Sequence, residues 1–347
     1  MKIIDFLKTT DLNDSLLIGY YGGGNLGDEL LLEVLMNLFK KCEYKNVSFF
    51  YLNPQLYNKF HHDFSYRLID AKSKFKLLRS IFSSKRIIIG GGGLWGLDFN
   101  IKVFILSLIL FFSRFFLGKK VYLISVGYYN STTFFGNIGA FFSGLASNLI
   151  LARDAESQDN FRFFKNKTYQ IKDISFSLSD VEFWEYRKDL LEIEKYFFPI
   201  DRKTIFMSVR RFPKKIQKNY SNLVISIVKN NPDKNFMLAI FEPKEIDKEG
   251  YEICRSLSEN LQNVHFLDFA YNPIALYLYF KQNSHNIVSI TPQYHGIAIA
   301  HLAGVPLMPI SYDNKCLELL REIGYHNPLP IFELTQNDIQ TFINSHY

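Results

Sequence analysis

The sequence contains little cysteine, and its few cysteines do not form a ligand set. Only three of the 347 residues are cysteine, and Cys42, Cys254 and Cys316 lie far apart with no CxxC spacing. This excludes a disulfide framework and a zinc site of the usual spacing. HExxH and DxD motifs and any credible Ser-His-Asp or Cys-His set are missing as well. We therefore expect a protein of the reducing cytoplasm that needs no metal and no cofactor.

The chain also lacks a strong charge of either sign. Lys and Arg number 40 against 34 Asp and Glu, which gives a mild formal charge of +6. No basic run is interleaved with periodic aromatic residues, so we expect no nucleic-acid partner. A mild positive charge instead favours acidic partners, such as phosphorylated metabolites or an anionic lipid surface.

No apolar run is long enough to span a bilayer, although one comes near. Residues Val103–Leu117 read VFILSLILFFSRFFL, with Lys102 before the run and Lys119 and Lys120 after it. A spanning helix needs roughly 20 apolar residues. Two interpretations are open: a buried helix of an α/β layer, which we favour, or an apolar surface helix resting on a membrane. The second would place this cytoplasmic protein at the inner face of the membrane.

What the sequence does contain is an alternation of short apolar runs and helical patterns. Hydrophobic residues make up 48% and charged residues 21%, as in globular proteins, and the length favours two domains. Runs such as SLLIGY at 15–20 and KTIFMSV at 203–209 precede helical stretches, which indicates parallel α/β architecture. We predict two Rossmann-like domains facing a central cleft. The predicted parts are a first domain at 1–178, a linker at 179–200, a second domain at 201–330 and a tail at 331–347.

Glycines follow the first predicted strand, where open α/β sheets bind ligands. The segment Gly19–Glu29 reads GYYGGGNLGDE and leads into a helix. Glycines let a ligand approach the backbone, and a helix N-terminus attracts an anion. We list Gly22, Asn25 and Asp28 as candidate substrate contacts. The pattern is neither a Walker loop nor GxGxxG, so a tight turn capped by Asn25 or Asp28 is the alternative.

A second run of glycines directly follows the apolar residues 86–89. Gly90–Gly93 are four successive glycines, and such a run costs backbone entropy in a regular element. A backbone nest for a ligand would justify that cost, and we list Gly91, Gly92 and Gly93 as candidate contacts. A flexible turn between the domains is the alternative interpretation.

The second half offers an arginine and a histidine after predicted strands. Arg210 ends the run KTIFMSVR, where it could clamp a carboxylate or phosphate through two hydrogen bonds, unless water solvates it. His295 lies in TPQYHG at 291–296, between an apolar run and a helical pattern. A histidine so placed can act as acid or base near neutral pH. His295 is our candidate catalytic residue, and a capping or core histidine is the alternative.

These four sites, in this order, resemble the polysaccharide pyruvyl transferase family over roughly Ile18 to Lys315. The resemblance implies two lobes arranged as in GT-B glycosyltransferases. It also implies transfer of pyruvate from phosphoenolpyruvate (PEP) to a sugar, usually as a ketal across two hydroxyls. The matching segments are GYYGGGNLGDE at Gly19–Glu29, GGGGLW at Gly90–Trp95, ARDAES at Ala152–Ser157 and HGIAIAHLAGVPLMPISYDNK at His295–Lys315.

The resemblance also assigns roles to residues of the second half. It places donor contacts at Arg210 and at Gln293, Tyr294 and His295, where the family has an Arg-x-His segment. Gln293 stands at the arginine position, which removes one positive charge and a bidentate grip on an anion. The acceptor would be a sugar, free or carried on a lipid.

Two other classes of function stay open at this stage. One is a glycosyltransferase that uses a nucleotide sugar, since GT-B enzymes commonly need no metal. The other is a non-catalytic family member that serves in a polysaccharide assembly complex, which the change at Gln293 favours. Binding of PEP or of a nucleotide sugar separates these classes.

Overall fold

A computed structural model of the chain describes residues 3–60, 66–95, 100–129, 133–179, 202–210, 212, 214–268 and 273–347. The chain forms two compact units. The first comprises Met1–Gly23 and Asp28–Ser177, and the second comprises Gly24–Gly27 and Leu178–Tyr347. The short segment Gly24–Gly27 therefore groups with the second unit, although it lies early in the chain. The predicted linker at 179–200 lies outside the described residues except for Ser179.

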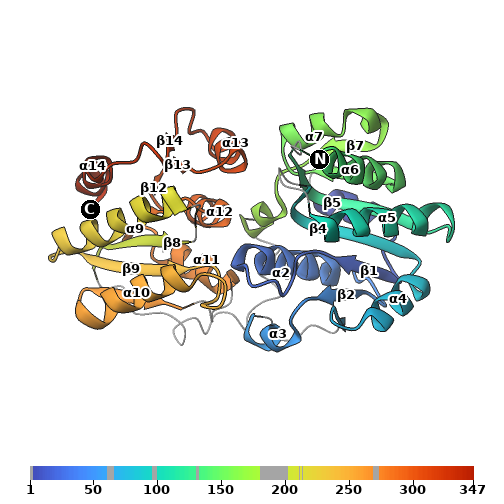
Figure 1. Ribbon diagram of the computed structural model, residues 1–347, viewed down its shortest axis with the longest axis horizontal. Helices are drawn as coiled ribbons and strands as arrows, with labels where there is room; N and C mark the ends of the chain where they lie inside the picture. Colours follow the sequence, from blue (N-terminus) through green and yellow to red (C-terminus); the bar gives the residue numbers. More distant parts are fainter. Residues whose placement is uncertain are drawn as a thin grey trace. The chain divides into compact units, whose positions relative to one another are not determined.

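The first unit is built on a seven-stranded parallel sheet in the order β3-β2-β1-β4-β5-β6-β7 (Figure 1). Helices cover both faces of this sheet, so every residue of β1 is buried. The strands are β1 (Ser15–Ile18), β2 (Ser48–Tyr51), β3 (Arg67–Asp70), β4 (Arg86–Trp95), β5 (Lys120–Tyr128), β6 (Leu149–Ala152) and β7 (Thr168–Gln170). The helices are α1 (Ile3–Thr9), α2 (Leu26–Lys41), α3 (Pro54–Phe60), α4 (Lys74–Ser83), α5 (Ile101–Phe115), α6 (Phe134–Ala146) and α7 (Ala155–Asn160), with 3-10 turns η1 (Arg162–Lys167) and η2 (Ile174–Ser179).

The second unit is built on a five-stranded parallel sheet in the order β10-β9-β8-β11-β12. A pair of two-residue strands, β13 and β14, forms a separate small sheet. The strands are β8 (Thr204–Val209), β9 (Asn235–Ile240), β10 (Val264–Leu267), β11 (Ile287–Ile290), β12 (Leu307–Met308), β13 (Ile310–Ser311) and β14 (Leu329–Pro330). The helices are α9 (Lys214–Asn230), α10 (Lys248–Asn260), α11 (Pro273–Gln282), α12 (Tyr294–Leu302), α13 (Asn314–Glu322) and α14 (Gln336–His346).

One face of the first sheet is covered by α4, α5 and α6. Ile81 of α4, Leu110 of α5 and Ala140 of α6 share one core with strand residues such as Ile87 and Leu123. α5 and α6 also lie against each other along much of their length (Figure 1). The three helices therefore form a single layer on this face of the sheet.

The alternation of apolar runs predicted the parallel strands, but two details of the prediction were wrong. Gly90–Gly93 are not a turn after the strand, because β4 continues through them to Trp95 and pairs with β5. The tail predicted at 331–347 contains α14, whose Gln340 hydrogen-bonds Asn231 at the end of α9. Short, half-buried elements such as α3, β3 and α13 were not predicted, because their apolar patterns are brief.

The apolar run Val103–Leu117 forms most of α5 and is neither wholly buried nor wholly on the surface. Leu110 is fully buried on the sheet, whereas Leu108 and Phe112 are 41% and 47% exposed. Within the described residues, no helix combines the length and the apolarity that a membrane crossing needs. One face of the segment is therefore buried on the sheet and the other is exposed, and contact of the exposed face with a membrane stays a prediction.

Candidate functional site

Both sheets place their first strand beside their fourth, at the point where the strand order reverses. β1 lies next to β4 in the first unit, and β8 lies next to β11 in the second. Ligands of open α/β sheets bind at the carboxyl ends of the strands at this point. Every predicted site residue lies within or just after one of these four strands: Gly22, Asn25 and Asp28 after β1, Gly91, Gly92 and Gly93 in β4, Arg210 after β8, and Gln293, Tyr294 and His295 after β11.

The turn after β1 is held by a buried carboxylate. Glu29 is fully buried, and its two oxygens accept hydrogen bonds from the Gly22 N–H and the Tyr51 hydroxyl, both at 2.7 Å. Gly22 has a φ of 72°, and a Cβ there would lie 2.7 Å from the Tyr51 ring. Only glycine fits that position. Packing within the first unit thus explains Gly22, and its contact with a substrate stays a prediction.

The glycines of β4 let helix α2 lie close to the strand. A Cβ on Gly91 would lie 2.9 Å from Leu31, and one on Gly92 would lie 3.2 Å from the Asp28 carboxylate. Both glycines have positive φ values, 69° and 86°. The neighbour is an apolar side chain at Gly91 and a carboxylate at Gly92, and the pairing with β5 shifts register beyond them, between Gly93 and Trp95. A ligand at Gly91, Gly92 or Gly93 stays a prediction.

A buried arginine directly follows β6 in the first unit and contacts the residue that directly follows β5. Arg153 is 2% exposed and donates to the Tyr129 hydroxyl at 2.7 Å. Its guanidinium lies 3.4 Å from Asp154 and 3.7 Å from Asp173, and 3.4 Å from a Cβ built on Gly93. Asp154 also caps α7. The ARDAES segment therefore forms a structural network of opposite charges.

The segment Gly24–Gly27 is packed into the second unit. The Leu26 N–H donates to the Phe241 carbonyl after β9 at 2.8 Å, and the Asn25 amide donates to Glu242 at 3.4 Å. Asn25 also accepts from the Gly27 N–H at 2.8 Å, so Asn25 rather than Asp28 caps α2. A Cβ on Gly27 would lie 1.9 Å from Nδ1 of His295. Gly27 is thus the residue that leaves room for the imidazole.

His295 lies in the first turn of α12 and is half-buried. The start of this helix is tied to β8, because the hydroxyls of Thr291 and Ser208 lie 2.6 Å apart. The Gln293 N–H donates to the same Thr291 hydroxyl at 3.3 Å, and the Tyr294 ring packs edge-on against the imidazole. The predicted donor contacts Gln293, Tyr294 and His295 are therefore fixed as one rigid turn.

Gln293 occupies the N-cap position of α12 without capping it. Its side chain makes no hydrogen bond to the helix amides. The residue is 4% exposed, and its Oε1 has no hydrogen-bond partner among the described residues. The positive end of the helix dipole at this helix start suits an anion.

Arg210 lies beside a second cation that the sequence reasoning missed. The Arg210 guanidinium donates to the Tyr312 hydroxyl at 2.8 Å and lies 4.6 Å from the centre of its ring. The Lys315 ammonium lies 5.5 Å from the centre of the same ring and 3.4 Å from Asp313. The matching segment that ends at Lys315 could have drawn attention to both residues, but no charge pattern marks them.

Both cations keep their protons in this setting. Burial lowers the pKa of Arg210, but Tyr312 and Glu242 outweigh it, so the pKa is raised. Burial likewise lowers the pKa of Lys315, and Tyr312 and Asp313 raise it above its ordinary value. Cys316 is different, because burial raises the pKa of its thiol well above the usual range. The second unit therefore presents two permanent positive charges on one aromatic ring, beside a neutral thiol.

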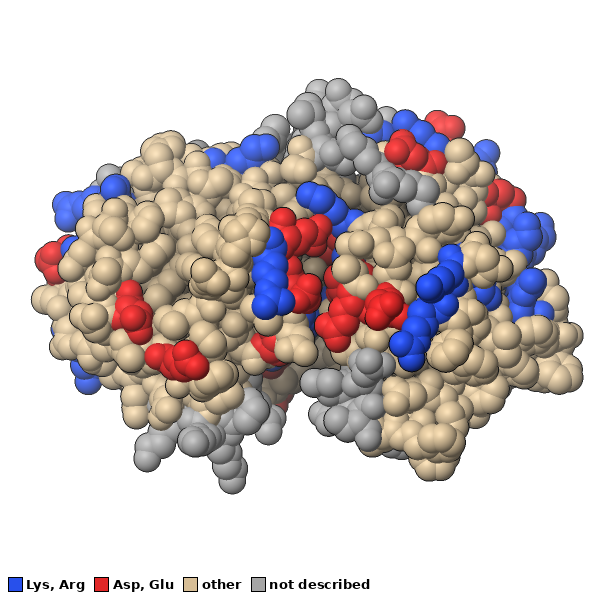
Figure 2. Space-filling view, turned by 90° about the horizontal axis from the view of Figure 1, so that it is seen from above, with Lys and Arg blue, Asp and Glu red and all other residues tan. Residues whose placement is uncertain are grey.

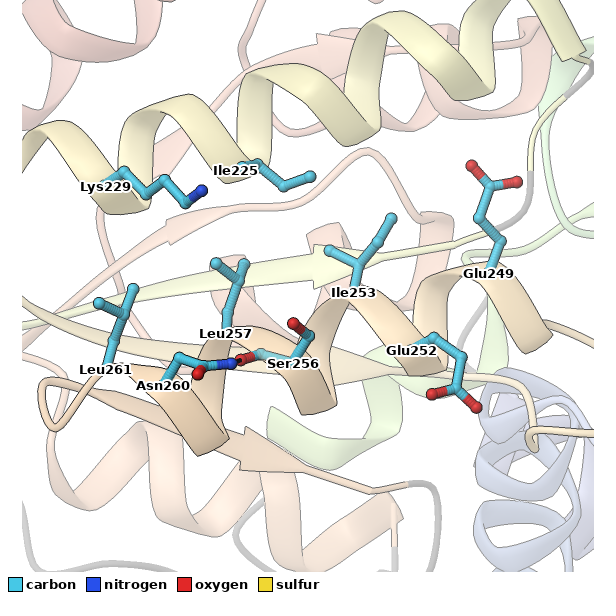
Figure 3. Close-up of a pocket in the computed structure, with 9 residues that line it drawn as sticks. All are labelled: Ile225, Lys229, Glu249, Glu252, Ile253, Ser256, Leu257, Asn260 and Leu261. Carbon is cyan, nitrogen blue, oxygen red and sulfur yellow. Dashed lines mark hydrogen bonds between the residues drawn. The ribbon is translucent and has the colours of Figure 1, made fainter.

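Two other surface features do not carry a site of this kind. A groove of about 430 Å³ lies between α9 and α10, lined by side chains such as Ile225, Leu257 and Glu252 (Figure 3). It lies along the sides of the helices rather than at the strand ends. The face shown in Figure 2 carries Lys and Arg beside Asp and Glu, with uncharged residues over most of its area. Among the residues described on that face, Lys and Arg form no broad basic surface of the kind that nucleic acids bind.

Three solved structures resemble the whole chain in fold. A UDP-GlcNAc 2-epimerase from Neisseria meningitidis, bound to UDP-GlcNAc, has a TM-score of 0.61 at 14% identity, covering 95% of this chain and 90% of that one. MnaA from S. aureus, with UDP, has a TM-score of 0.61 at 10% identity over 95% and 87%. Anabaena Alr3699/HepE, with UDP and glucose, has a TM-score of 0.57 at 12% identity over 96% and 89%. These likenesses confirm the GT-B-like α/β fold.

Comparison with curated protein sequences gave no match. The family model described as polysaccharide pyruvyl transferase matches residues 25–314. This range runs from the Asn25 cap to the first turn of α13, so it includes Arg210, the Gln293–His295 turn and Tyr312. The match covers most of the sequence and confirms the resemblance seen in its motifs: the chain belongs to the polysaccharide pyruvyl transferase family.

Proposed function

We propose that this protein transfers pyruvate from PEP to two hydroxyls of a sugar, forming a ketal, in the biosynthesis of a cell-surface polysaccharide. The observation that carries the proposal is the pair of protonated cations, Arg210 and Lys315, on the Tyr312 ring. PEP carries a carboxylate and a phosphate, and two fixed cations match two anionic groups. The guanidinium can bind either group through two parallel hydrogen bonds.

The start of α12 supplies the remaining parts of a donor site. The positive end of the helix dipole would attract an anionic oxygen there, and Gln293 makes no side-chain cap at this helix start. Gln293 lacks the charge of the family arginine. Lys315 lies on the first turn of α13, where the neighbouring Cys316 thiol donates to the Pro292 carbonyl at 3.4 Å. In this proposal Lys315 replaces the positive charge that Gln293 does not provide.

His295 would move the proton that starts the reaction. Protonation of the PEP methylene carbon makes C2 electrophilic, and the first sugar hydroxyl bonds to C2. The C2–O bond to phosphate then breaks, and the second hydroxyl bonds to C2 in its place. The two hydroxyl protons end on the new methyl group and on the released phosphate. General acid–base help of this kind typically contributes 10²–10⁴-fold in rate.

Ligand-induced thermal stabilisation tests the donor directly. A ligand at 100 times its Kd adds about 2.7 kcal/mol to stability. We expect PEP to raise the Tm of the protein, and Arg210→Ala and Lys315→Met to reduce that rise. Arg255→Ala removes an exposed arginine of α10 and is the matched control. A rise with PEP that is equal in all four proteins would place the donor elsewhere and refute this site.

Gln293→Arg tests the same site by adding a positive charge instead of removing one. It restores the charge at the family position, and a new charge-assisted hydrogen bond is worth about 1.5–3 kcal/mol. We therefore expect PEP to bind at least about tenfold more tightly to Gln293→Arg, measured by titration calorimetry. Unchanged or weaker binding would mean that the donor does not contact position 293, and it would contradict a donor site at the start of α12.

A nucleotide sugar is the second candidate donor, because two solved structures of the same fold contain UDP-GlcNAc or UDP with glucose. A thermal shift with UDP-GlcNAc and none with PEP would favour a glycosyltransferase. Absence of a shift with either ligand would favour a non-catalytic family member in an assembly complex.

A further inference from the structure

The outer surface of the α4–α5–α6 layer is unusually apolar. Among the described residues, 18 large hydrophobic side chains are exposed, and 14 of them lie on this layer and the adjoining turns. We call these residues the apolar helix face. They are Phe75, Leu78 and Phe82 of α4, Ile101, Ile105, Leu108, Phe112 and Phe115 of α5 with the following Phe116, Phe134, Phe135, Phe141 and Leu145 of α6, and Phe163 of η1.

The face is regular within each helix. On α5 the exposed residues from Ile101 to Phe115 recur at intervals of three and four, so they form one stripe along the helix. Residues Phe75, Leu78 and Phe82 repeat that spacing on α4. A stripe of this kind usually faces the core of a protein. Here a second apolar stripe faces outward.

Apart from Leu110, the buried residues of α5 and α6 are small: Ser107 and Ser113 of α5, and Gly139, Ala140, Ser143, Gly144 and Ala146 of α6. Ser107 of α5 and Ser143 of α6 are fully buried and lie 2.8 Å apart through their hydroxyls. A Cβ on Gly139 would lie 3.3 Å from the Phe104 ring. Small residues let the helices approach closely, and the large apolar side chains are left on the outside.

The face is also continuous from helix to helix. Phe111 of α5 contacts Phe142 of α6 with ring centres 5.2 Å apart, and Phe141 contacts Phe163 of η1 at 6.4 Å. On the other side, Lys119 after α5 donates to the Phe82 carbonyl at the end of α4 at 3.0 Å. Contiguous apolar surface of this extent marks an interaction site.

The net charge of the segment that contains most of the apolar helix face indicates what kind of surface binds to it. Between Ala71 and Ala152 the sequence holds ten Lys and Arg but only one of its 34 Asp and Glu. This stretch thus carries +9, and the rest of the chain carries −3. Lys74, Lys76 and Arg79 are exposed between the aromatic residues of α4, and Lys102 and Lys120 are exposed at either end of α5.

We propose that the apolar helix face lies on an anionic lipid bilayer. Aromatic and aliphatic side chains would enter the boundary between headgroups and acyl chains, and the exposed Lys and Arg would contact lipid phosphates. A second copy of the chain fits less well, because two faces of the same positive charge repel each other. The proposal extends the predicted membrane contact of Val103–Leu117 to three helices and a turn. It does not depend on the proposed donor.

Flotation with lipid vesicles tests the proposal without any assay of activity. The probes are phosphatidylcholine vesicles with and without about one quarter phosphatidylglycerol. We expect the protein to float with the anionic vesicles, less at high salt and least with phosphatidylcholine alone. Leu108→Asp/Phe112→Asp should weaken binding at least tenfold. Phe332→Asp changes a 69%-exposed phenylalanine of the second unit and should bind as the unsubstituted protein does.

Charge reversal on α4 gives a second, independent measurement. Each lipid-facing Lys or Arg near an anionic surface contributes about fivefold to binding. Lys74→Glu/Lys76→Glu should therefore weaken binding to anionic vesicles and leave binding to phosphatidylcholine unchanged. Failure of the unsubstituted protein to float with anionic vesicles would overturn the proposal. So would a lipid-free dimer, seen by light scattering, that Leu108→Asp/Phe112→Asp disperses.

Discussion

In the first unit, the strand ends where β1 meets β4 are filled by the chain's own side chains. Glu29 is buried in hydrogen bonds to Gly22 and Tyr51, and Leu31 packs on Gly91. In the second unit, the equivalent strand ends, where β8 meets β11, carry Arg210 and the turn of His295. The first arrangement satisfies its polar groups internally, whereas the second gathers positive charges and an uncapped helix start.

We infer from this difference that one topology can serve two purposes. Both sheets offer a binding position at the same place, because strand order fixes it. Side chains then decide whether the position binds a ligand or stabilises the fold. The following predictions separate the two cases: substitutions at the strand ends of the second unit should change activity, and those at the strand ends of the first should change stability.

The largest effect is expected from removing the imidazole in the second unit. His295→Ala should lower kcat by about 10²–10⁴-fold, because the reaction loses its acid–base group. The measurement is release of inorganic phosphate from PEP in the presence of the sugar acceptor. Thermal unfolding of the same variant shows whether it is folded. A turnover close to that of the unsubstituted protein would remove His295 from the mechanism.

The next largest effect is expected at Gly27, which touches no substrate in our proposal. Alanine at a helical glycine normally stabilises, by roughly 0.5–1 kcal/mol. Here its Cβ would meet Nδ1 of His295 at 1.9 Å, so the imidazole has to move. A displacement of about 1 Å at a catalytic group costs about 10²-fold in rate. We expect Gly27→Ala to lose about that much in kcat.

Two variants check the cause of this loss. Gly118→Ala places a Cβ where nothing lies within 4 Å, and it should leave kcat unchanged although its φ of 64° costs an alanine about 1–2 kcal/mol in stability. The double variant Gly27→Ala/His295→Ala has no clash, because the imidazole is absent. Its loss in the free energy of unfolding should therefore be smaller than the sum of the losses in the two single variants. Additive free energies of unfolding would show that Gly27 and His295 do not contact each other.

The sequence predicted this fold well because parallel strands are continuous apolar runs. The predicted apolar runs at 15–20 and 203–209 contain β1 and β8, and every residue of these two strands is buried. A flexible turn stayed open as the alternative at the glycine run of β4, because glycine is usually a sign of a turn. Only the pairing with β5 shows that the strand continues through it.

The site was predictable only where one residue follows one strand. Arg210 and His295 come directly after β8 and β11, so their positions could be inferred from the order of elements. Lys315 follows a strand of two residues, which is too short to recognise. Its place beside Arg210 depends on how Tyr312 packs, and no local pattern encodes a contact across 102 residues.

A loss of stability without a specific loss of chemistry is expected in the first unit. Glu29→Ala would leave the Gly22 N–H and the Tyr51 hydroxyl without this acceptor in a buried place. An unsatisfied buried group costs about 1–3 kcal/mol, so we expect a loss of about 3 kcal/mol in the free energy of unfolding. Glu29→Gln keeps the shape and one acceptor oxygen, and its amide N–H can donate to the Tyr51 hydroxyl, so it should recover more than half. Equal losses in urea unfolding of the two variants would contradict this account.

The smallest effect is a pH-dependent one at the edge of the second unit. Asp338 forms a capping box with Thr335 at the start of α14, and these hydrogen bonds lower the pKa of its carboxyl below the ordinary value of 3.8. A carboxylate with a lowered pKa stabilises the fold above that ordinary value. The contribution is lost as the pH falls through the lowered pKa. Because the residue is exposed, we expect Asp338→Asn to cost less than about 1 kcal/mol at pH 7. Urea unfolding at pH 7 and near pH 3 should show the difference between the two proteins shrinking in acid, and a difference that grows in acid would mean that the carboxylate does not act through the cap.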